Sequence, residues 1–138
     1  MPLLSKTHFP LQIGGFDALY GLEILSLGED EGTARVPVRP EVLQPGGLVH
    51  GGVHASIAES LATIATAKAV GAEGKGAQAL SSQISFLRPI QEGAVHATAR
   101  RRHRGRTTWV WEVDVTDDDG RPCALVRITV AVRAASSD

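Results

Sequence analysis

The chain has 138 residues, of which 43% are hydrophobic, and a formal net charge of −1. A chain of this length folds as one domain that buries roughly two thirds of its unfolded surface, and its near-zero charge argues against nucleic acid or a membrane as a partner. The single cysteine excludes an internal disulfide, and the lack of a leader-like segment or a long apolar run favours a cytoplasmic protein.

Two strands are predicted before the longest helix. Residues 22–27 and 33–38 have strand character, and the polar turn 28–32 joins them as a hairpin. Residues 40–47 form a connection. Residues 53–69 contain no proline or glycine and are rich in alanine, leucine and isoleucine, which predicts a helix of about four to five turns.

Four further strands are predicted after the helix and a loop at 71–76. They cover residues 78–87, 94–102, 107–116 and 123–132. One face of the third carries its large apolar side chains, Trp109, Trp111, Val113 and Val115. Asp117 to Gly120 forms the turn that follows.

This order of elements predicts an α+β fold in which an antiparallel sheet of about five or six strands wraps one long helix. We expect a single domain over residues 1–138, with residues 1–16 as an N-terminal extension and residues 134–138 as a frayed tail.

Glu59 lies on the opposite side of the predicted helix from its apolar face. That apolar face carries Val53, Ile57, Leu61 and Ile64, whereas the stripe around Glu59 contains small residues that leave room for a ligand. No Lys or Arg stands three or four positions away, which weakens a helical salt bridge as the reason for this carboxylate. A plain surface charge remains the alternative to a reaction centre.

The predicted start of the helix lacks a usual capping side chain. His50, Gly51 and Gly52 precede it without Ser, Thr, Asp or Asn, so first-turn N–H groups are expected to face outward and attract developing negative charge. The Gly-Gly pair can equally be a tight turn. His50 and His54 lack the glutamate of a zinc-binding helix, so we predict no metal site; His50 should shape the turn and His54 should lie at an interface or surface.

Several motifs along the chain resemble those of a known family. Likeness covers most residues from about Asp17 onward and is carried by Gln44, Leu48-Val49-His50-Gly51-Gly52, Ala58-Glu59-Ser60-Leu61-Ala62-Thr63, Phe86-Leu87-Arg88-Pro89, Gly105-Arg106-Thr107-Thr108-Trp109-Val110-Trp111, Asp119-Gly120-Arg121-Pro122-Cys123 and Ala131-Val132-Arg133. The chain thereby resembles the hotdog-fold acyl-CoA thioesterases, near the Glu-helix type of 4-hydroxybenzoyl-CoA thioesterase and the phenylacetic-acid-degradation and 1,4-dihydroxy-2-naphthoyl-CoA thioesterases.

The resemblance implies a hotdog fold and a set of roles around the helix. Glu59 matches the catalytic carboxylate, Gly51 the amide that polarises the thioester carbonyl, and Gln44 a polar residue that assists there. Thr63 matches a hydroxyl that holds the hydrolytic water. Spacing of four residues puts it on the face of Glu59, although its hydroxyl can equally bond to the backbone of its own helix.

Coenzyme A provides the second set of predicted contacts. The resemblance places Arg88 near the nucleotide and Thr107 near the pantetheine arm or phosphates, with His50 and Gly52 as further substrate-binding residues. Five arginines between Arg100 and Arg106 suit phosphate capture, and Arg106 is the candidate taken from them. A solvated strand end is the alternative. No cofactor is expected, because coenzyme A is part of the substrate.

A distance argument predicts self-association. Gly51 and Glu59 are eight positions apart, about 12 Å along a helix, whereas groups that act on one carbonyl lie within roughly 3–3.5 Å of it. One site should therefore draw on two chains related by a twofold axis. The resemblance likewise implies a homodimer, often paired into a homotetramer.

We therefore predict a thioesterase that hydrolyses an aromatic or related acyl-CoA, as in aromatic compound degradation, with Glu59 as nucleophile or general base. Two alternatives stay open: a hotdog hydratase or dehydratase acting on 3-hydroxyacyl or enoyl thioesters, and a non-catalytic acyl-CoA-binding protein.

Overall fold

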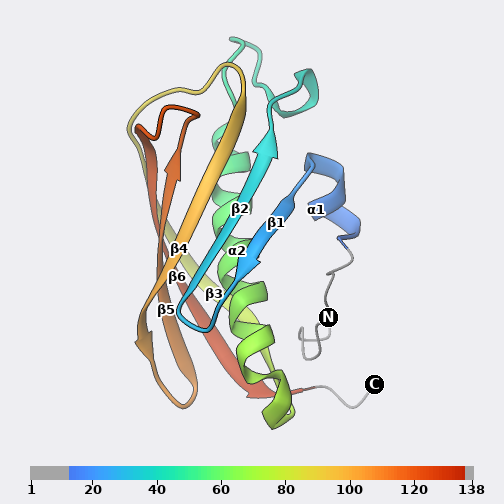
Figure 1. The fold of residues 1–138 in the computed structure, drawn as a ribbon, viewed down its shortest axis with the longest axis vertical. Coiled ribbons are helices and arrows are strands. Elements are labelled where there is room, and N and C mark those ends of the chain that lie inside the picture. Colours follow the sequence, from blue (N-terminus) through green and yellow to red (C-terminus); the bar gives the residue numbers. More distant parts are fainter. Residues whose placement is uncertain (1–12, 136–138) are drawn as a thin grey trace.

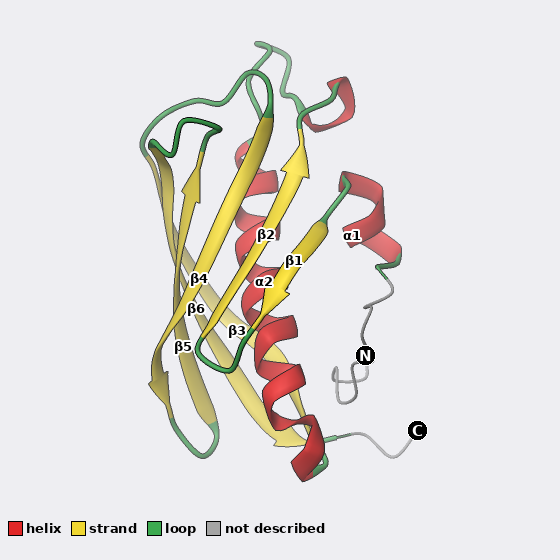
Figure 2. Ribbon diagram, in the orientation of Figure 1, coloured by secondary structure: helices red, strands yellow, loops and turns green. Residues whose placement is uncertain are grey.

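The computed structural model describes residues 13–135 and contains one antiparallel sheet packed on one long helix. The long helix α2 (Gly51–Val70) lies along the sheet, which curves around it (Figures 1 and 2). The strands are β1 (Glu23–Leu27), β2 (Glu31–Pro37), β3 (Lys75–Phe86), β4 (Ala94–Arg104), β5 (Thr108–Thr116) and β6 (Pro122–Ala134). Their spatial order is β1-β2-β4-β5-β6-β3. The predicted α+β arrangement is confirmed.

The start of α2 differs from the sequence prediction because histidine serves as its cap. His50 is the N-cap residue, and its Nδ1 accepts a hydrogen bond of 2.8 Å from the backbone N–H of Gly52. The N–H of Val53 donates to the His50 carbonyl oxygen at 2.9 Å. The helix therefore begins two residues earlier than predicted, and fewer first-turn N–H groups are open than the sequence suggested.

The core forms where the apolar face of α2 meets β5. Ile57 and Leu61 of the helix and both tryptophans of the strand are almost fully buried. The indole N–H of Trp111 donates to Thr66 Oγ1 at 2.8 Å, so this buried polar group is satisfied inside the core. The predicted inward face of the strand at 107–116 is confirmed.

A short helix, α1 (Gly15–Tyr20), was not predicted from the sequence. The hydroxyl of Tyr20 donates to Asp17 at 3.0 Å and to Ser60 at 3.3 Å, and the Ser60 hydroxyl donates to Asp17 at 2.7 Å. This triangle ties α1 to α2 beside Glu59. Tertiary contacts, not local periodicity, hold the element in place.

Other boundaries shift by a few residues. A 3₁₀ turn (Pro40–Val42) occupies part of the predicted connection. The predicted loop at 71–76 is shorter than expected, because a second 3₁₀ turn (Gly71–Glu73) occupies its first half and β3 begins at Lys75. Residues 1–12 of the predicted extension and 136–138 of the predicted tail lie outside the described residues, whereas Ala134 ends β6. Within the described range, no helix is long and apolar enough to span a membrane.

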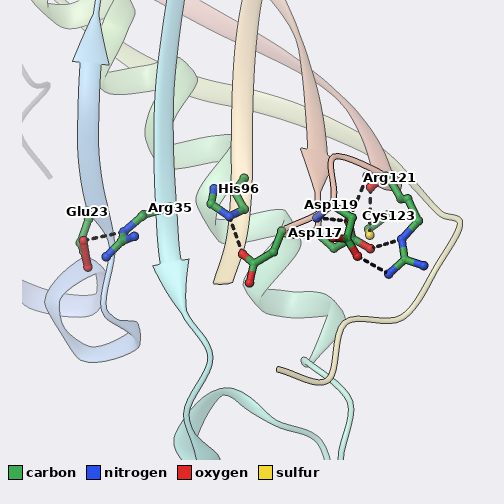
Figure 3. Close-up of polar contacts among 8 residues, drawn as sticks. Glu23, Arg35, His96, Asp117, Asp119, Arg121 and Cys123 are labelled. Carbon is green, nitrogen blue, oxygen red and sulfur yellow. Dashed lines mark hydrogen bonds and ion pairs between the residues drawn. The ribbon is translucent and has the colours of Figure 1, made fainter. Parts of the chain in front are cut away.

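The predicted turn between β5 and β6 is held by Asp117 (Figure 3). Its carboxylate accepts hydrogen bonds from the backbone N–H groups of Asp119 (3.0 Å) and Arg121 (2.9 Å) and from Arg121 Nε (2.7 Å). Although burial acts in the opposite direction, the hydrogen bonds from Arg121 hold the pKa of Asp117 below its ordinary value.

Candidate active site

A groove of about 410 Å³ opens at the first residue of α2. The loop before the helix forms one side and the residues that follow β3 form the other. Its lining residues are Gln44, Leu48, Val49, Gly51, His54, Phe86, Leu87, Arg88 and Pro89. The structure thus brings together three of the predicted site residues, Gln44, Gly51 and Arg88.

The backbone N–H of Gly51 is an open donor at this groove. No acceptor for it occurs among residues 13–135, and the positive end of the α2 dipole adds to its attraction for negative charge. Phe86 explains why glycine is needed here. A Cβ at this position would come within 2.9 Å of the Phe86 ring, so any larger residue would displace that side chain.

Gln44 is held as a hydrogen-bond donor by the turn in which it lies. Its backbone N–H donates to the Leu48 carbonyl at 2.7 Å, and its side-chain Oε1 accepts from the backbone N–H of Gly46. The Oε1 atom is therefore occupied, and the carboxamide NH₂ is the part left to meet a ligand. A carbonyl oxygen in the groove would find donors from both Gln44 and Gly51.

His50 and Gly52 are engaged with each other rather than with the groove. Because Nδ1 of His50 accepts the Gly52 N–H, its proton is on Nε2, and the exposed ring can act outward only as a donor. The Gly52 N–H is not free for a ligand.

Glu59 is exposed in the single chain, contrary to the expectation of a carboxylate enclosed by small residues. It makes no hydrogen bond or ion pair with the other described residues and does not line the groove. It lies about 12 Å along α2 from Gly51 and about 80° around the helix axis. One chain therefore does not gather the two groups on a single carbonyl.

The hydroxyl of Thr63 is shielded from solvent and has no partner among residues 13–135. Two neighbours behave differently: Ser56 donates to the Gly52 carbonyl at 2.6 Å, and Thr66 donates to the Ala62 carbonyl at 2.8 Å. The alternative in which Thr63 bonds to its own helix is therefore not seen. In the single chain its hydroxyl, one turn beyond Glu59, is unpaired among the described residues but shielded from solvent.

Comparison with known proteins now decides the family. Residues 46–124 match the family model described as the thioesterase superfamily. The chain belongs to the thioesterase superfamily. It is similar to a 1,4-dihydroxy-2-naphthoyl-CoA hydrolase of Listeria monocytogenes, with 34% identity over 86% of this chain and 96% of the relative. It is also similar to the proofreading thioesterase EntH of Cronobacter turicensis, with 33% identity over 94% and 98%.

Solved structures agree with this assignment. The fold matches the crystal structure of a thioesterase from Haemophilus influenzae with a TM-score of 0.81 and 33% identity, over 86% of this chain and 82% of that one. The sheet wrapped around α2 is therefore the hotdog fold, and the protein is a thioester hydrolase.

The arginines of this thioesterase are mostly paired along its strands. Arg100 contacts Asp114 at 2.9 Å, and Arg102 lies 3.7 Å from Glu112. Arg101 and Arg104 pair with Glu29, and both guanidinium groups lie over the Trp109 ring. These four side chains support strand pairing more directly than they support phosphate binding.

Arg106 and Thr107 are exposed at the turn between β4 and β5, far from Arg88. Arg106 lines a small pocket of about 130 Å³ together with Val70, the last residue of α2, and Lys75, the first residue of β3. The groove at Gly51 lies at the other end of both elements. The structure therefore separates the predicted CoA contacts of one chain into two places.

His54 and Phe86 are among the groove residues that were not predicted as site residues from the sequence. His54 was expected at an interface or surface, but the structure leaves it only 4% exposed. Phe86 was part of the family likeness without an assigned role, and its ring now lies over Gly51. The spacing of three between Gly51 and His54 was the available signal, because such residues are neighbours on a helix.

Proposed function

We propose that this thioesterase hydrolyses an aromatic or related acyl-CoA to the free acid and coenzyme A. The observation that carries the proposal is the groove at Gly51, where the open N–H and the Gln44 amide lie beside the apolar side chains of Leu48 and Phe86. The Listeria relative named for a naphthoyl-CoA substrate supports an aromatic acyl group. No cofactor is needed beyond the CoA of the substrate. The lone thiol Cys123 fits a cytoplasmic enzyme.

The two donors stabilise the charge that develops on the thioester oxygen. When an oxygen attacks the carbonyl carbon, the C=O electron pair moves to the oxygen, which the N–H of Gly51 and the NH₂ of Gln44 then bind. The tetrahedral intermediate collapses with cleavage of the C–S bond. Coenzyme A leaves as a thiolate and takes up a proton.

Glu59 supplies the attacking oxygen by one of two routes. Its carboxylate either takes a proton from water, so that hydroxide attacks, or attacks directly and forms a mixed anhydride that water then hydrolyses. Thr63, with its hydroxyl free of the helix backbone, holds that water one turn away. Glu59 makes no ion pair with the other residues of the range 13–135, which leaves the carboxylate available for either route.

We place Glu59 of one chain at the groove of a second copy, as a homodimer that can pair into a tetramer. The separation of about 12 Å between Gly51 and Glu59 on one helix supports this. The outer edge of β3 supports it as well, because no described strand pairs with it and its residues Leu80 and Phe86 are 53% and 57% exposed. Such an edge can pair with its own copy about a twofold axis.

A substrate panel tests the activity. Release of free thiol from benzoyl-, phenylacetyl-, hydroxybenzoyl- and medium-chain acyl-CoA should be fastest with an aromatic acyl group. Burial raises the pKa of the Cys123 thiol, so the protein itself should react slowly with the thiol reagent.

The same panel distinguishes the alternatives. A hydratase would consume an enoyl-CoA without releasing thiol, and a binding protein would do neither. Equal slow rates with every acyl group would contradict the aromatic assignment while leaving thioester hydrolysis intact.

A further inference from the structure

His54 is a buried polar side chain whose hydrogen bonding is incomplete. The residue is 4% exposed, and its Nδ1 is closed to solvent and has no partner among residues 13–135. Burial lowers the pKa of this ring, which is therefore neutral at neutral pH, with one nitrogen that donates and one that accepts.

The two other buried polar residues of the described range, Thr66 and Asp117, are satisfied, whereas the shielded hydroxyl of Thr63 also lacks a partner there. Thr66 bonds to Ala62 and Trp111, and Asp117 accepts three hydrogen bonds from its turn. An unsatisfied buried nitrogen destabilises the fold, so a ring kept in this condition calls for an explanation outside the packing of the single chain.

His54 lies in the wall of the groove, so a molecule bound there lies beside its ring. His54 follows Gly51 by three positions, which places the two residues next to each other on one side of α2. Its ring lies 6.0 Å from the Phe86 ring, centroid to centroid, and forms part of the groove wall with Gln44 and Arg88.

We propose that His54 is a substrate-binding residue whose imidazole hydrogen-bonds a polar group of the thioester close to the carbonyl held at Gly51. This rests on the proposed function. Two parts of an acyl-CoA carry such a group near the carbonyl: the amide of the cysteamine arm, two methylenes beyond the sulfur, and a hydroxyl on the acyl group next to the carbonyl. Both offer the same chemistry to a neutral imidazole.

Two substitutions separate hydrogen bonding from packing. His54→Phe keeps a ring against Phe86 and removes both nitrogens. His54→Asn gives up ring volume but places a polar atom near the position of Nδ1. If the ring binds substrate, the Phe variant should lose about tenfold in kcat/KM, and the Asn variant should recover part of it.

Four thioesters identify the group that is bound. With benzoyl-N-acetylcysteamine, which carries the amide alone, a tenfold loss in the Phe variant assigns His54 to the cysteamine amide. A loss seen only with 2-hydroxybenzoyl-CoA and not with benzoyl-CoA assigns it to the acyl hydroxyl. With the benzoyl thioester of butanethiol, which has neither group, the two proteins should agree within about twofold.

Two results would overturn the proposal. One is an equal loss with all the thioesters, including the butanethiol ester, which marks His54 as a packing residue. The other is unchanged kcat/KM throughout. The melting temperature provides a second test. Without substrate, His54→Phe should melt at a higher temperature than wild type, because the substitution removes an unsatisfied buried group.

Failure of this proposal is distinguishable from failure of the proposed function. Loss of activity in Glu59→Ala with no substrate-dependent effect at His54 contradicts only the role of His54. Full activity in Glu59→Ala contradicts the proposed mechanism whatever His54 does.

Discussion

Glu59 is exposed and makes no ion pair within the described part of the chain, so its replacement should lower the activity without destabilising the fold. Glu59→Ala removes the group that attacks or activates water, and we expect kcat to fall by about a thousandfold or more. Glu59→Asp, shorter by one methylene, should keep part of the activity. Thiol release measures kcat, and the melting temperature of each variant serves as the control.

A Glu59→Ala enzyme with kcat within about tenfold of wild type would show that another group performs the attack. The melting temperatures matter here because Ser60, the next residue, ties α1 to α2 through Tyr20 and Asp17. An unchanged melting temperature shows that this contact is intact.

Thr63 permits a second test at the level of one atom. Its shielded hydroxyl has no partner among residues 13–135, so Thr63→Val should keep or slightly raise the melting temperature and should lower kcat about tenfold, because the hydrolytic water is no longer held. Thr63→Ser retains the hydroxyl and is the matched control. Equal kcat in the Val and Ser variants would remove Thr63 from the mechanism.

At the scale of elements, long patterned segments were predictable and short tertiary ones were not. The helix and the six strands follow from periodicity and turn residues, with boundaries shifted by a few positions. Helix α1 has six residues and depends on the Asp17, Tyr20 and Ser60 contacts, which no local pattern encodes. The cap by His50 was missed because histidine is outside the usual set of N-cap residues.

The buried imidazole on α2 makes stability depend on pH. Because burial holds the pKa of His54 below its ordinary value of 6.5, the unfolded chain takes up a proton while the folded ring stays neutral. The free energy of unfolding should therefore fall as pH drops below about 6.5, and the fall should end once pH passes the folded pKa. Arg88 is the charged residue in the same groove.

Urea unfolding of wild type and His54→Phe at about pH 7.5 and about pH 5.5 measures this linkage. The variant lacks the titrating group, so its stability should change less between the two pH values. An equal change in both proteins would assign the pH dependence to other groups.

No described strand pairs with the outer edge of β3, and we expect this edge to join two copies of the chain. Leu80, 53% exposed on this strand, should be covered in the dimer, so Leu80→Lys should shift the protein toward a single chain in light scattering. Leu125→Lys is the matched control, because Leu125 is 47% exposed but lies on β6 inside the sheet. If both variants behave alike, the edge is not the contact.

At the scale of the whole molecule, the single chain brings some of the predicted site residues together and keeps others apart. Gln44, Gly51 and Arg88 meet in one groove although they come from three parts of the sequence. Glu59 and Arg106 do not join them, because each lies farther toward the other end of α2. The distance between Gly51 and Glu59 could be calculated from the geometry of a helix. The position of Arg106 depends on strand order, which local patterns do not specify.

Pairing of β3 with its own copy would resolve this separation. In an antiparallel pair, the Phe86 end of one strand lies beside the Lys75 end of the other. Arg106 shares its pocket with Lys75, so it would come near the groove of the second chain, where Arg88 and Gly51 lie. Arg106 should therefore act on the same substrate as Glu59 of its own chain.

Hybrid dimers test which chain supplies each group. One chain carries Gly51→Pro, which removes the N–H at a helix position where the backbone accepts proline and also displaces the Phe86 ring of that chain, and the other carries Glu59→Ala. Purified with two different tags, the hybrid should keep one working site, made of Gly51 from the second chain and Glu59 from the first. An inactive hybrid would contradict sites shared between chains.

Adding Arg106→Ala to one chain of that hybrid at a time then places the phosphate contact. In the chain that supplies Glu59, the change should raise KM for acyl-CoA about tenfold with kcat little changed, since it removes a charged hydrogen bond to the nucleotide. In the chain that supplies Gly51, it should have no effect. The opposite pattern would show that Arg106 serves the groove of its own chain, and the antiparallel β3 pairing that predicts otherwise would have to be abandoned.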